Sequence, residues 1–574
     1  MGAFFLNHKS SSLSFRQLDE IYEKKGFIHP AMFKLGDYHL RLYPKQLIGI
    51  PNFYIDGTKS VYACGSLFYK GLGYVNSLKA LLKDHFADNI DPGELYGNYV
   101  LLFYDEISSG IDLYIDPAFL KNVYYSDKAK VISSDFLAIM YGTNGKFTLN
   151  NKAIVENITT GHLIPPDTCV NEILKLDKIN IRSLGKFFGG ISFGTVDPTS
   201  DTAPVSRAEA IVDANHKLSA YFKSAAELSD EFGAHFGLTG GFDSRLLLMH
   251  ARKHLKNLMT NSFWRTASKE YVNAKELARV SGLDFFSFEH KPFLKPAPEV
   301  MMKYAFYFFD GQVRSQNRWD EEYNQPGYTA EISQGKYVGF HGSGGEQYRN
   351  ADRFYGKISL KQYILYHWMF RQCSDSFLDN DLQHEVYENI KFKISRITGI
   401  QADKIDLGAL KRIQNEVWNA ANRTTRVNAL NQQQFYFAPF TEFQLSYPAY
   451  QYIPFLGKSL SFQIDMMKNI DQELSAINTN YGFNLIEGEK WTNQILPLIV
   501  HLFPAKLFNA IYHQIKHTQK TGLKTKFDIR PYSEHFKSCQ SRLDLHKLNE
   551  NVNLAPVVFA MNYFLKINEN HLKP

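Results

Sequence analysis

The spacing of apolar residues along the chain changes once, near residue 186. Before that point, short runs alternate between apolar and polar residues, as in residues 99–104 and 111–115, and they end at turn-forming residues such as Ser108-Ser109-Gly110. Such runs predict antiparallel strands that pack as two sheets. Residues 186–204 are rich in Gly, Ser, Thr, Pro and Asp, which is typical of a linker. We therefore expect a β-sandwich domain over residues 1–185.

After the linker, helical spacing alternates with apolar runs. Helices are predicted over residues 207–228, 244–255 and 270–281, and strands over residues 232–238, 258–263 and 285–289. This alternation predicts a parallel sheet covered by helices. From about residue 357 the pattern is mostly helical. The expected fold is thus an α+β sandwich domain followed, over residues 205–574, by an α/β parallel-sheet domain with a helical C-terminal part.

Composition excludes several classes of protein. The formal net charge is +6 over 574 residues, which is too small an excess to favour nucleic acid or an anionic membrane as a partner. The four cysteines have neither zinc-site nor disulfide-scaffold spacing. The best candidate for a membrane span, residues 495–503, is too short to cross a bilayer and contains Pro497 and His501, and the N-terminus lacks a signal-peptide pattern. We expect a cytoplasmic protein, and the sequence leaves the oligomeric state open, a homodimer included.

One segment carries candidate chemistry, Phe236-Gly237-Leu238-Thr239-Gly240-Gly241-Phe242-Asp243-Ser244-Arg245. Here an apolar strand leads into a Gly-Gly turn and then a helix. Glycines let backbone N–H groups approach a ligand closely, and a helix N-terminus favours a phosphate. Thr239 and Ser244 add hydroxyl donors, while Asp243 suits a divalent cation that bridges to the phosphate. The simpler interpretation is a tight turn whose Asp or Ser caps the helix.

Residues 239–244 resemble the Ser-Gly-Gly-x-Asp-Ser pyrophosphate loop of the class B asparagine synthetase family, which has the ATP-pyrophosphatase fold; Thr239 replaces the first Ser. Asn261-Ser262-Phe263-Trp264 resembles the family's second strand, and residues 337–346 resemble its second nucleotide loop. In that register Glu346 takes the place of the second metal-binding acid. The resemblance implies ATP and Mg²⁺ as cofactors, with Asp243 and Glu346 as catalytic and metal-binding residues. It also implies nucleotide contacts from Leu238, Thr239, Gly240, Gly241, Asp243, Ser244, Ser262, Gly342 and Ser343.

Upstream, residues 95–99, 114–117, 123–125 and 133–135 follow the order of the family's glutaminase domain, which has an N-terminal-nucleophile fold. That domain works through a cysteine at position 2, where this chain has Gly2. The family's substrate strand maps to residues 64–69, which lack the polar groups that hold glutamine. We therefore expect no glutaminase activity. Cys64 is the less favoured replacement nucleophile, because a mid-strand cysteine is usually a core residue.

The same loss of cysteine marks the β-lactam synthetases and lasso-peptide cyclases, which the chain resembles in this respect. The family's lysine near the nucleotide has no counterpart in residues 478–483, and Ser343 stands about where the β-lactam synthetases carry a tyrosine. A cation for the departing pyrophosphate would then come from elsewhere. The candidates are Lys458, Lys468, Arg423 and Arg426.

Two further groups stand where the family binds substrate or phosphate. Asp310-Gly311-Gln312, with Arg314 and Arg318, corresponds to the amino-acid site, and Arg349 and Arg353 follow the second loop. Arginines at this spacing can clamp a carboxylate or a phosphate. A solvated helix face is the more ordinary interpretation of both groups.

The resemblance implies an ATP-dependent, AMP-forming amide ligase that adenylates a substrate carboxylate and transfers it to an amine or to ammonia. The partner would be a small molecule or a peptide with a carboxylate. One alternative is an asparagine synthetase that uses ammonia. Another is a pyrophosphatase-fold enzyme acting on RNA or on a thiolation substrate, against which the small positive charge and the missing cysteine pairs count. The last is an inactive homologue that serves as a binding or scaffold protein.

Overall fold

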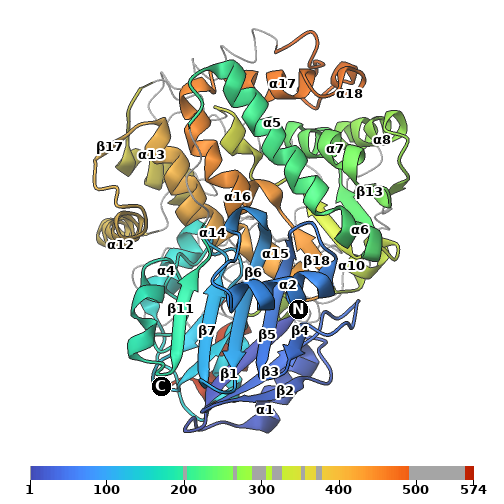
Figure 1. The fold of residues 1–574 in the computed structure, drawn as a ribbon. Helices are drawn as coiled ribbons and strands as arrows, with labels where there is room; N and C mark the ends of the chain where they lie inside the picture. Colours follow the sequence, from blue (N-terminus) through green and yellow to red (C-terminus); the bar gives the residue numbers. More distant parts are fainter. Residues whose placement is uncertain are drawn as a thin grey trace, which may run out of the picture.

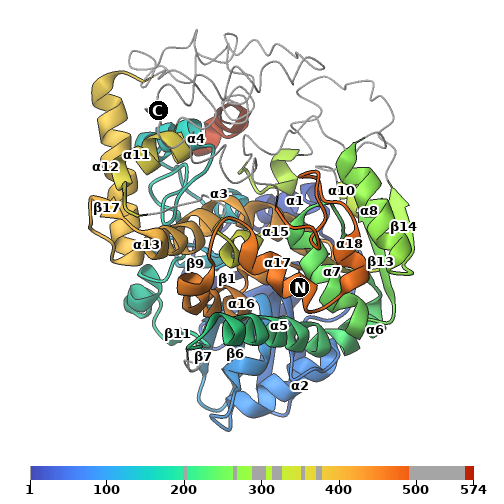
Figure 2. The ribbon, with the colours of Figure 1, turned by 90° about the horizontal axis from the view of Figure 1, so that it is seen from above.

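The computed structural model describes residues 2–197, 203–262, 268–287, 305–312, 326–350, 356–369, 378–489, 561 and 563–573. Two sheet-containing units are stacked on each other, with the N-terminal unit at the bottom of Figure 1. Helices α12 (Asn380–Thr398) and α13 (Leu407–Arg412) lie on the opposite side of the molecule from α7 (Phe242–His254) and α8 (Lys269–Val280), as Figures 1 and 2 both show.

The N-terminal unit contains two sheets. The first is antiparallel, in the order β10-β8-β9-β1-β3-β2, and the second has the order β11-β7-β6-β5-β4. The second is mixed, because β11 runs parallel to β7. The strands are β1 (Ala3–His8), β2 (Ala31–Leu35), β3 (Tyr38–Tyr43), β4 (Phe53–Asp56), β5 (Lys59–Tyr69), β6 (Leu95–Asp105), β7 (Gly110–Ile115), β8 (Tyr124–Ser126), β9 (Val131–Ser133), β10 (Leu174–Lys175) and β11 (Ile191–Thr195).

A core of alternating side chains joins these two sheets. Leu6 and Leu40 of the first sheet and Cys64 and Val100 of the second are fully buried in the same cluster. The expected two-sheet packing is therefore observed, and Cys64 is one of its core residues. The N-terminal unit also contains helices α1 (Phe15–Lys24), α2 (Tyr74–His85), α3 (Phe136–Gly142) and α4 (Asn151–Thr160).

Part of the predicted linker segment forms a strand. Residues 191–195, inside the predicted 186–204 segment, form β11 and extend the second sheet beside β7. These five residues include Ile191, Phe193 and Thr195, which favour strands, and hydrogen bonding to β7 places them at the edge of the sheet. The next element, α5 (Arg207–Ser224), begins at its N-cap Ser206.

The second unit contains a five-stranded, all-parallel sheet in the order β14-β13-β12-β15-β18. Its strands are β12 (Ala234–Gly237), β13 (Leu258–Ser262), β14 (Phe285–Ser287), β15 (Val338–His341) and β18 (Phe435–Phe437). The chain leaves β12 toward β13 and β14, then returns to β15 on the other side of β12. Such a reversal is a topological switch point, where ligands of open α/β sheets bind.

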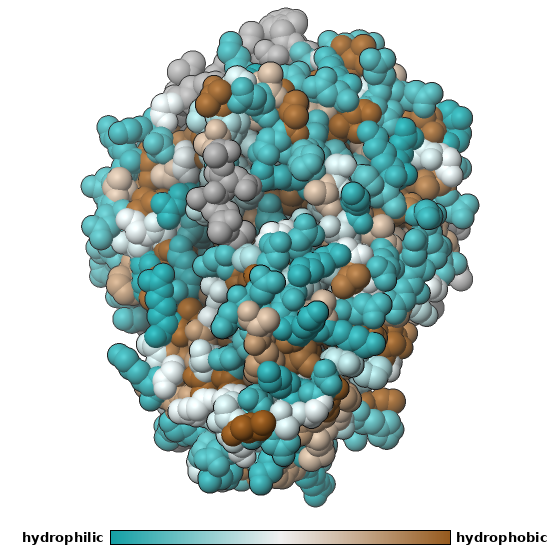
Figure 3. Space-filling view, in the orientation of Figure 1, coloured by the Kyte–Doolittle hydropathy of each residue, from teal (hydrophilic) through white to brown (hydrophobic). Residues whose placement is uncertain are grey.

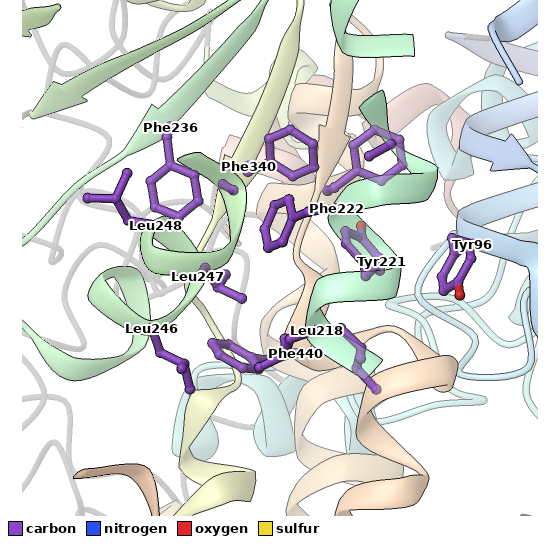
Figure 4. Close-up of a cluster of buried hydrophobic side chains, with 14 of the residues drawn as sticks. Tyr96, Leu218, Tyr221, Phe222, Phe236, Leu246, Leu247, Leu248, Phe340 and Phe440 are labelled. Carbon is purple, nitrogen blue, oxygen red and sulfur yellow. The ribbon is translucent and has the colours of Figure 1, made fainter. Parts of the chain in front are cut away.

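Helices cover this sheet and also connect it to the N-terminal unit. In Figure 4, Phe236 and Phe340 from neighbouring strands meet leucines 246–248 of α7 and Phe222 of α5. The ring of Tyr96, from β6, packs edge to face against Tyr221 with centroids 5.2 Å apart. One continuous apolar cluster thus includes residues from both units. The other helices of this region are α6 (Ala226–Phe232) and α10 (Pro326–Ser333).

The region after residue 357 is mostly helical, as expected, with one important exception. Strand β18 completes the parallel sheet on the far side of β15, and a two-stranded sheet pairs β16 (Ile358–Ser359) with β17 (Lys404–Ile405). The described residues of this region also form α11 (Leu360–Tyr363), α14 (Ala420–Asn422), α15 (Thr424–Asn431), α16 (Phe443–Ser446), α17 (Ser461–Lys468) and α18 (Gln472–Ala476).

The surface is mainly hydrophilic on the face drawn in Figure 3, with apolar residues scattered among polar ones. Within the described part of the chain, no helix combines the length and the apolarity needed to cross a bilayer.

Candidate functional site

The two glycine-rich loops meet at the switch point. Strands β12 and β15 run parallel with Gly237 opposite His341, so the loops that follow them leave the same edge of the sheet. A Cβ built on Gly342 would lie 2.8 Å from the backbone nitrogen of Ser244. Only a residue without a side chain allows this approach, so the glycine is required by contact between the loops.

The first loop is held closed by its own hydroxyl groups. The hydroxyls of Thr239 and Ser244 lie 2.9 Å apart, and the Gly241 N–H donates to Thr239 Oγ1 at 3.2 Å. Helix α7 then begins at Phe242, and its N-cap residue, Gly241, has no side chain with which to cap the helix. The first N–H groups of α7 therefore need an acceptor from outside the helix.

Two residues that the sequence predicts as nucleotide contacts, Leu238 and Ser262, are buried in the sheet beside the loops. Leu238 is fully buried in the core, and its N–H donates to Asn261 O at 2.8 Å. Ser262 is fully buried at the end of β13, next to β12. Both positions fix the edge of the sheet from which the loops leave.

The carboxylate of Asp243 is bound by an arginine and an amide. Arg349 donates to it from Nη2 at 3.1 Å, and Nη1 lies 2.8 Å from Asp243 Oδ1 in an ion pair. Gln463, fully buried on α17, donates from Nε2 to Asp243 Oδ1 at 2.9 Å and accepts from Arg349 Nη1 at 3.2 Å. The ion pair and the hydrogen bonds from Arg349 and Gln463 hold the carboxylate in one orientation.

Glu346 lies beside Asp243 and has its own cations. Its carboxylate forms an ion pair with Arg423, and the Lys411 ammonium donates to its backbone carbonyl at 2.6 Å. Gly345 brings the two acids together, since a Cβ on it would lie 2.2 Å from Asp243 Oδ1. The site therefore combines two carboxylates with Arg349, Arg423 and Lys411.

The two acids have pKa values shifted in opposite directions. Burial raises the pKa of Asp243, and the neighbouring Glu346 charge adds to the rise, while Arg349 opposes it. Burial also disfavours ionised Glu346, but the charges of Arg423 and Arg349 outweigh it and lower the pKa of Glu346 to about 2. Glu346 is thus ionised at neutral pH, and unequal environments of this kind are common at functional sites.

His341 and Ser343 form a small network at the start of the second loop. The Ser343 N–H donates to His341 Nδ1 at 3.2 Å, and the Ser343 hydroxyl lies 2.7 Å from the same nitrogen. Burial, together with the charges of Arg426 and Arg423, lowers the pKa of His341 to about 3. The imidazole is therefore neutral, and it positions Ser343.

Residues 478–483 lie against the Gly-Gly turn. Asn480 donates its N–H to Gly240 O at 3.3 Å, and a Cβ on Gly240 would lie 2.1 Å from Asn480 Oδ1. Asn273 donates to the same Oδ1 at 3.1 Å. Arg245 holds residues 474–478, which precede Asn480, by donating to Leu474 O, Ile477 O and Asn478 O. An amide, rather than a cation, thus lies next to the turn.

The residues of this site suit magnesium. Mg²⁺ in nucleotide sites uses one or two carboxylates and takes its other ligands from phosphates and water, and Asp243 and Glu346 supply two. Within the described residues, no group of three or more His, Cys, Asp or Glu side chains could hold a metal.

Asp310 is buried in an ion pair and does not lie on a solvated helix face. Its carboxylate accepts from Lys25 Nζ at 2.9 Å and from the N–H groups of Phe136 and Leu137. Lys25 also pairs with Asp135, and its side chain is fully buried. Asp310 therefore connects the N-terminal unit to the rest of the chain, and its carboxylate caps the N-terminus of α3.

The other candidate cations differ in placement. Arg423 contacts Glu346, and Arg426 is close enough for its charge to affect His341. Lys458 is exposed and Lys468 half-buried, and no contact connects either to the acids. Several candidates lie outside the described residues: Phe263, Trp264, Arg314, Arg318, Arg353, Cys373 and Cys539.

Residue 2 has no room for a side chain. A Cβ on Gly2 would lie 2.4 Å from Phe27 Cε1 and 2.7 Å from Pro44 O. Cys64 Sγ lies 3.7 Å from Gly2 O, inside the sandwich core. Residue 2 therefore has no room for a cysteine side chain, and the thiol of Cys64 is buried away from any substrate.

Three contacts at the site were missed in the sequence. Lys411 and Gln463 lie 65 and 220 residues from the acids they contact, and Asn273 reaches the turn from α8. Single polar residues on amphipathic helices carry no local signal that distinguishes them from surface residues.

No model of a known protein family matches the chain, and no curated protein matches it either.

Proposed function

We propose that the chain is an ATP-dependent, AMP-forming ligase with the ATP-pyrophosphatase fold. Its N-terminal unit would be a glutaminase-like domain without glutaminase activity. Asp243 and Glu346 would hold Mg²⁺, which neutralises phosphate charge, and the loop over residues 239–244 would bind the β- and γ-phosphates of ATP. A substrate carboxylate would become an acyl-adenylate, from which an amine or ammonia displaces AMP.

One observation carries this proposal: two acid-bearing glycine loops touch at the switch point of a parallel sheet. The contact of Gly345 with Asp243 leaves no space for a side chain between them, and Glu346 adds the second carboxylate. A tight loop of this kind is needed where a backbone must approach phosphates. A turn with only a structural role needs neither a second glycine loop nor a second acid.

The cations around the acids support a polyphosphate as the ligand. Arg349, Arg423 and Lys411 contact the two acidic residues, and Arg426 lies near His341. Arg423 pairs with Glu346, and the charges of Arg423 and Arg426 both act on His341 at the start of the second loop. Arg423 and Arg426 are therefore the best candidates to stabilise departing pyrophosphate, in place of the lysine that residues 478–483 do not provide.

Pyrophosphate exchange into ATP tests the adenylation step. The wild-type protein would be assayed with Mg²⁺ and a panel of free amino acids, peptides and sugar acids. We expect exchange that depends on one class of acid and is abolished in Asp243→Asn. A variant with Asp403→Asn, whose carboxylate is 87% exposed on another part of the surface, is the control. Exchange that persists in Asp243→Asn would contradict the assignment.

A second candidate function, an inactive binding protein, is favoured by one observation. Both carboxylates are already paired with arginines, an arrangement that is complete without a metal. In that case Mg²⁺ and ATP together would produce no change in the protein's melting temperature, whereas a ligase would be stabilised by both.

A further inference from the structure

Tyr481 lies in a tight turn whose shape is fixed by its own hydrogen bonds. The N–H and the hydroxyl of Thr479 both donate to Phe483 O, at 2.9 and 2.7 Å. The Gly482 N–H donates back to Thr479 O at 3.1 Å, and Gly482 has a φ of +78°, which favours glycine. Residues 479–483 therefore form a closed turn that fixes the position of the Tyr481 backbone.

This turn is attached to the first glycine loop. Asn480, the residue before Tyr481, donates its N–H to Gly240 O at 3.3 Å. The ring of Tyr481 lies against that of Phe242, with centroids 5.4 Å apart and an interplanar angle of 56°. Phe242 is the first residue of α7 and directly precedes Asp243. The phenol ring thus lies beside the N-terminus of α7, next to the place where the two loops meet.

The hydroxyl group of Tyr481 has no structural task. The residue is 51% exposed, whereas Phe242 and Phe483, the rings that it contacts, are each 1% exposed. In the part of the chain that the structure describes, Tyr481 makes these two ring contacts and a backbone hydrogen bond to Thr479 Oγ1, and its hydroxyl has no partner. Packing requires only the ring, so the hydroxyl can donate to a ligand.

Tyr481 also lies near the arginine that binds Asp243. Burial lowers the pKa of Arg349, but the nearby Asp243 carboxylate and the Tyr481 phenol, when ionised, raise it, and the net shift is upward. The charge of Glu346 contributes less to this rise than the phenol does. Tyr481 therefore belongs to the electrostatic surroundings of the two acids.

A phosphate in the first loop would need hydrogen-bond donors at this place. The first N–H groups of α7 lack an acceptor within the helix, and the N-cap residue Gly241 has no side chain. A phosphate that accepts from those N–H groups would lie next to Phe242, and hence beside the Tyr481 ring. A hydroxyl makes a stronger hydrogen bond to a charged oxygen than to a neutral one.

We propose that Tyr481 is a binding residue of the nucleotide site, whose hydroxyl donates a hydrogen bond to the terminal phosphates of ATP. This inference rests on the proposed ligase function and adds to it a residue that favours a triphosphate over a monophosphate. Arg349 and Arg423 supply charge at the two acids, whereas the phenol supplies a directed hydrogen bond at the loop.

Calorimetric titration of Mg-ATP and of AMP tests this role in Tyr481→Phe, which keeps the ring against Phe242 and removes only the hydroxyl. We expect Mg-ATP to bind the variant about tenfold more weakly than the wild type, as for loss of a hydrogen bond to a charged group. AMP lacks the terminal phosphates, so its affinity should change by less than about twofold. Tyr447→Phe, at another tyrosine that is 45% exposed, is the control and should leave both affinities unchanged.

A parallel titration of Asp243→Asn separates this inference from the proposed function. If Asp243→Asn loses Mg-ATP binding while Tyr481→Phe keeps the wild-type affinity, the ligase site stands and the role of Tyr481 is overturned. Equal losses of ATP and AMP affinity in Tyr481→Phe would also overturn it, because the hydroxyl would then not act on the terminal phosphates. Absence of Mg-ATP binding by the wild-type protein would overturn both proposals.

Discussion

Gly345 faces the carboxylate of Asp243 so closely that a Cβ on residue 345 would lie 2.2 Å from Oδ1. The carboxylate cannot move away freely, because Arg349 and Gln463 both bind it. The two loops are therefore fitted to each other at a glycine and an acid that lie about a hundred residues apart in the chain.

Gly345→Ala should consequently displace Asp243. We expect a loss of about 1–3 kcal/mol in the free energy of unfolding, the range for a group forced into a packed site, and Mg-ATP binding weakened at least tenfold. Urea unfolding and calorimetric titration measure the two effects. Gly145→Ala, where a Cβ has no heavy atom within 4 Å, is the control and should change stability by less than about 0.5 kcal/mol. Equal behaviour of the two variants would contradict the fit.

Arg423→Gln should leave Glu346 without its closest countercharge. We expect destabilisation of roughly 2–3 kcal/mol at neutral pH, less than for a fully buried pair because solvent reaches both side chains and Arg349 remains. The double variant Arg423→Gln/Glu346→Gln should recover most of that loss, since it removes the uncompensated charge. No recovery in the double variant would mean that Arg423 acts through other contacts.

The low pKa of Glu346 predicts a defined pH dependence. Its pKa falls from an ordinary value of 4.5 to about 2 on folding, so its ionisation stabilises the protein fully above about pH 4.5, and this contribution is lost as the pH falls toward 2. The difference in unfolding free energy between wild type and Glu346→Gln should therefore shrink between those pH values. A difference that stays constant in urea titrations from pH 6 to pH 3 would contradict the assigned ion pair.

Gly2→Cys should not create a glutaminase. The added side chain would collide with Phe27 and Pro44 O, so we expect destabilisation of about 1–3 kcal/mol and no release of glutamate from glutamine in a coupled assay. Adding Phe27→Ala should relieve part of the strain but still yield no hydrolysis. Measurable glutaminase activity in either variant would show that this part of the N-terminal unit can still form a catalytic site.

Asp310→Ala should weaken the connection between the N-terminal unit and the rest of the chain. It leaves the buried Lys25 with one acid and removes the acceptor for two N–H groups of α3, so we expect a loss of about 3 kcal/mol or more. Asp403→Ala, in an exposed pair with Lys391, should cost less than about 1 kcal/mol. Similar losses in the two variants would show that the buried pair has no special role.

Much of the parallel-sheet unit could be predicted from the sequence. Around the Gly-Gly turn, the expected strands and helices agree with β12, α7, β13 and α8 to within two residues, because amphipathic helices alternate there with short apolar strands. Strand β18 was missed, since it is three residues long, buried throughout, and lies in a helical region. Its position depends on pairing with β15, about a hundred residues earlier.

The candidate site was predicted only in part, for a similar reason. Glycines and acids in a short loop carry a local signal, so Asp243 and Glu346 could be named from the sequence. The pairing of Arg423 with Glu346 and of Gln463 with Asp243 depends on the packing of distant helices. The burial of Asp310 was missed because its partner Lys25 lies 285 residues away and leaves no local signal in the sequence.

Calorimetric titration of ATP into the protein, with and without Mg²⁺, tests the central claim most directly. If Asp243 and Glu346 together hold a magnesium-bound nucleotide, ATP should bind the wild-type protein only when Mg²⁺ is present, and Asp243→Asn and Glu346→Gln should each weaken binding at least tenfold while the fold is retained. Mg²⁺-independent binding, or unchanged affinity in both variants, would contradict the account.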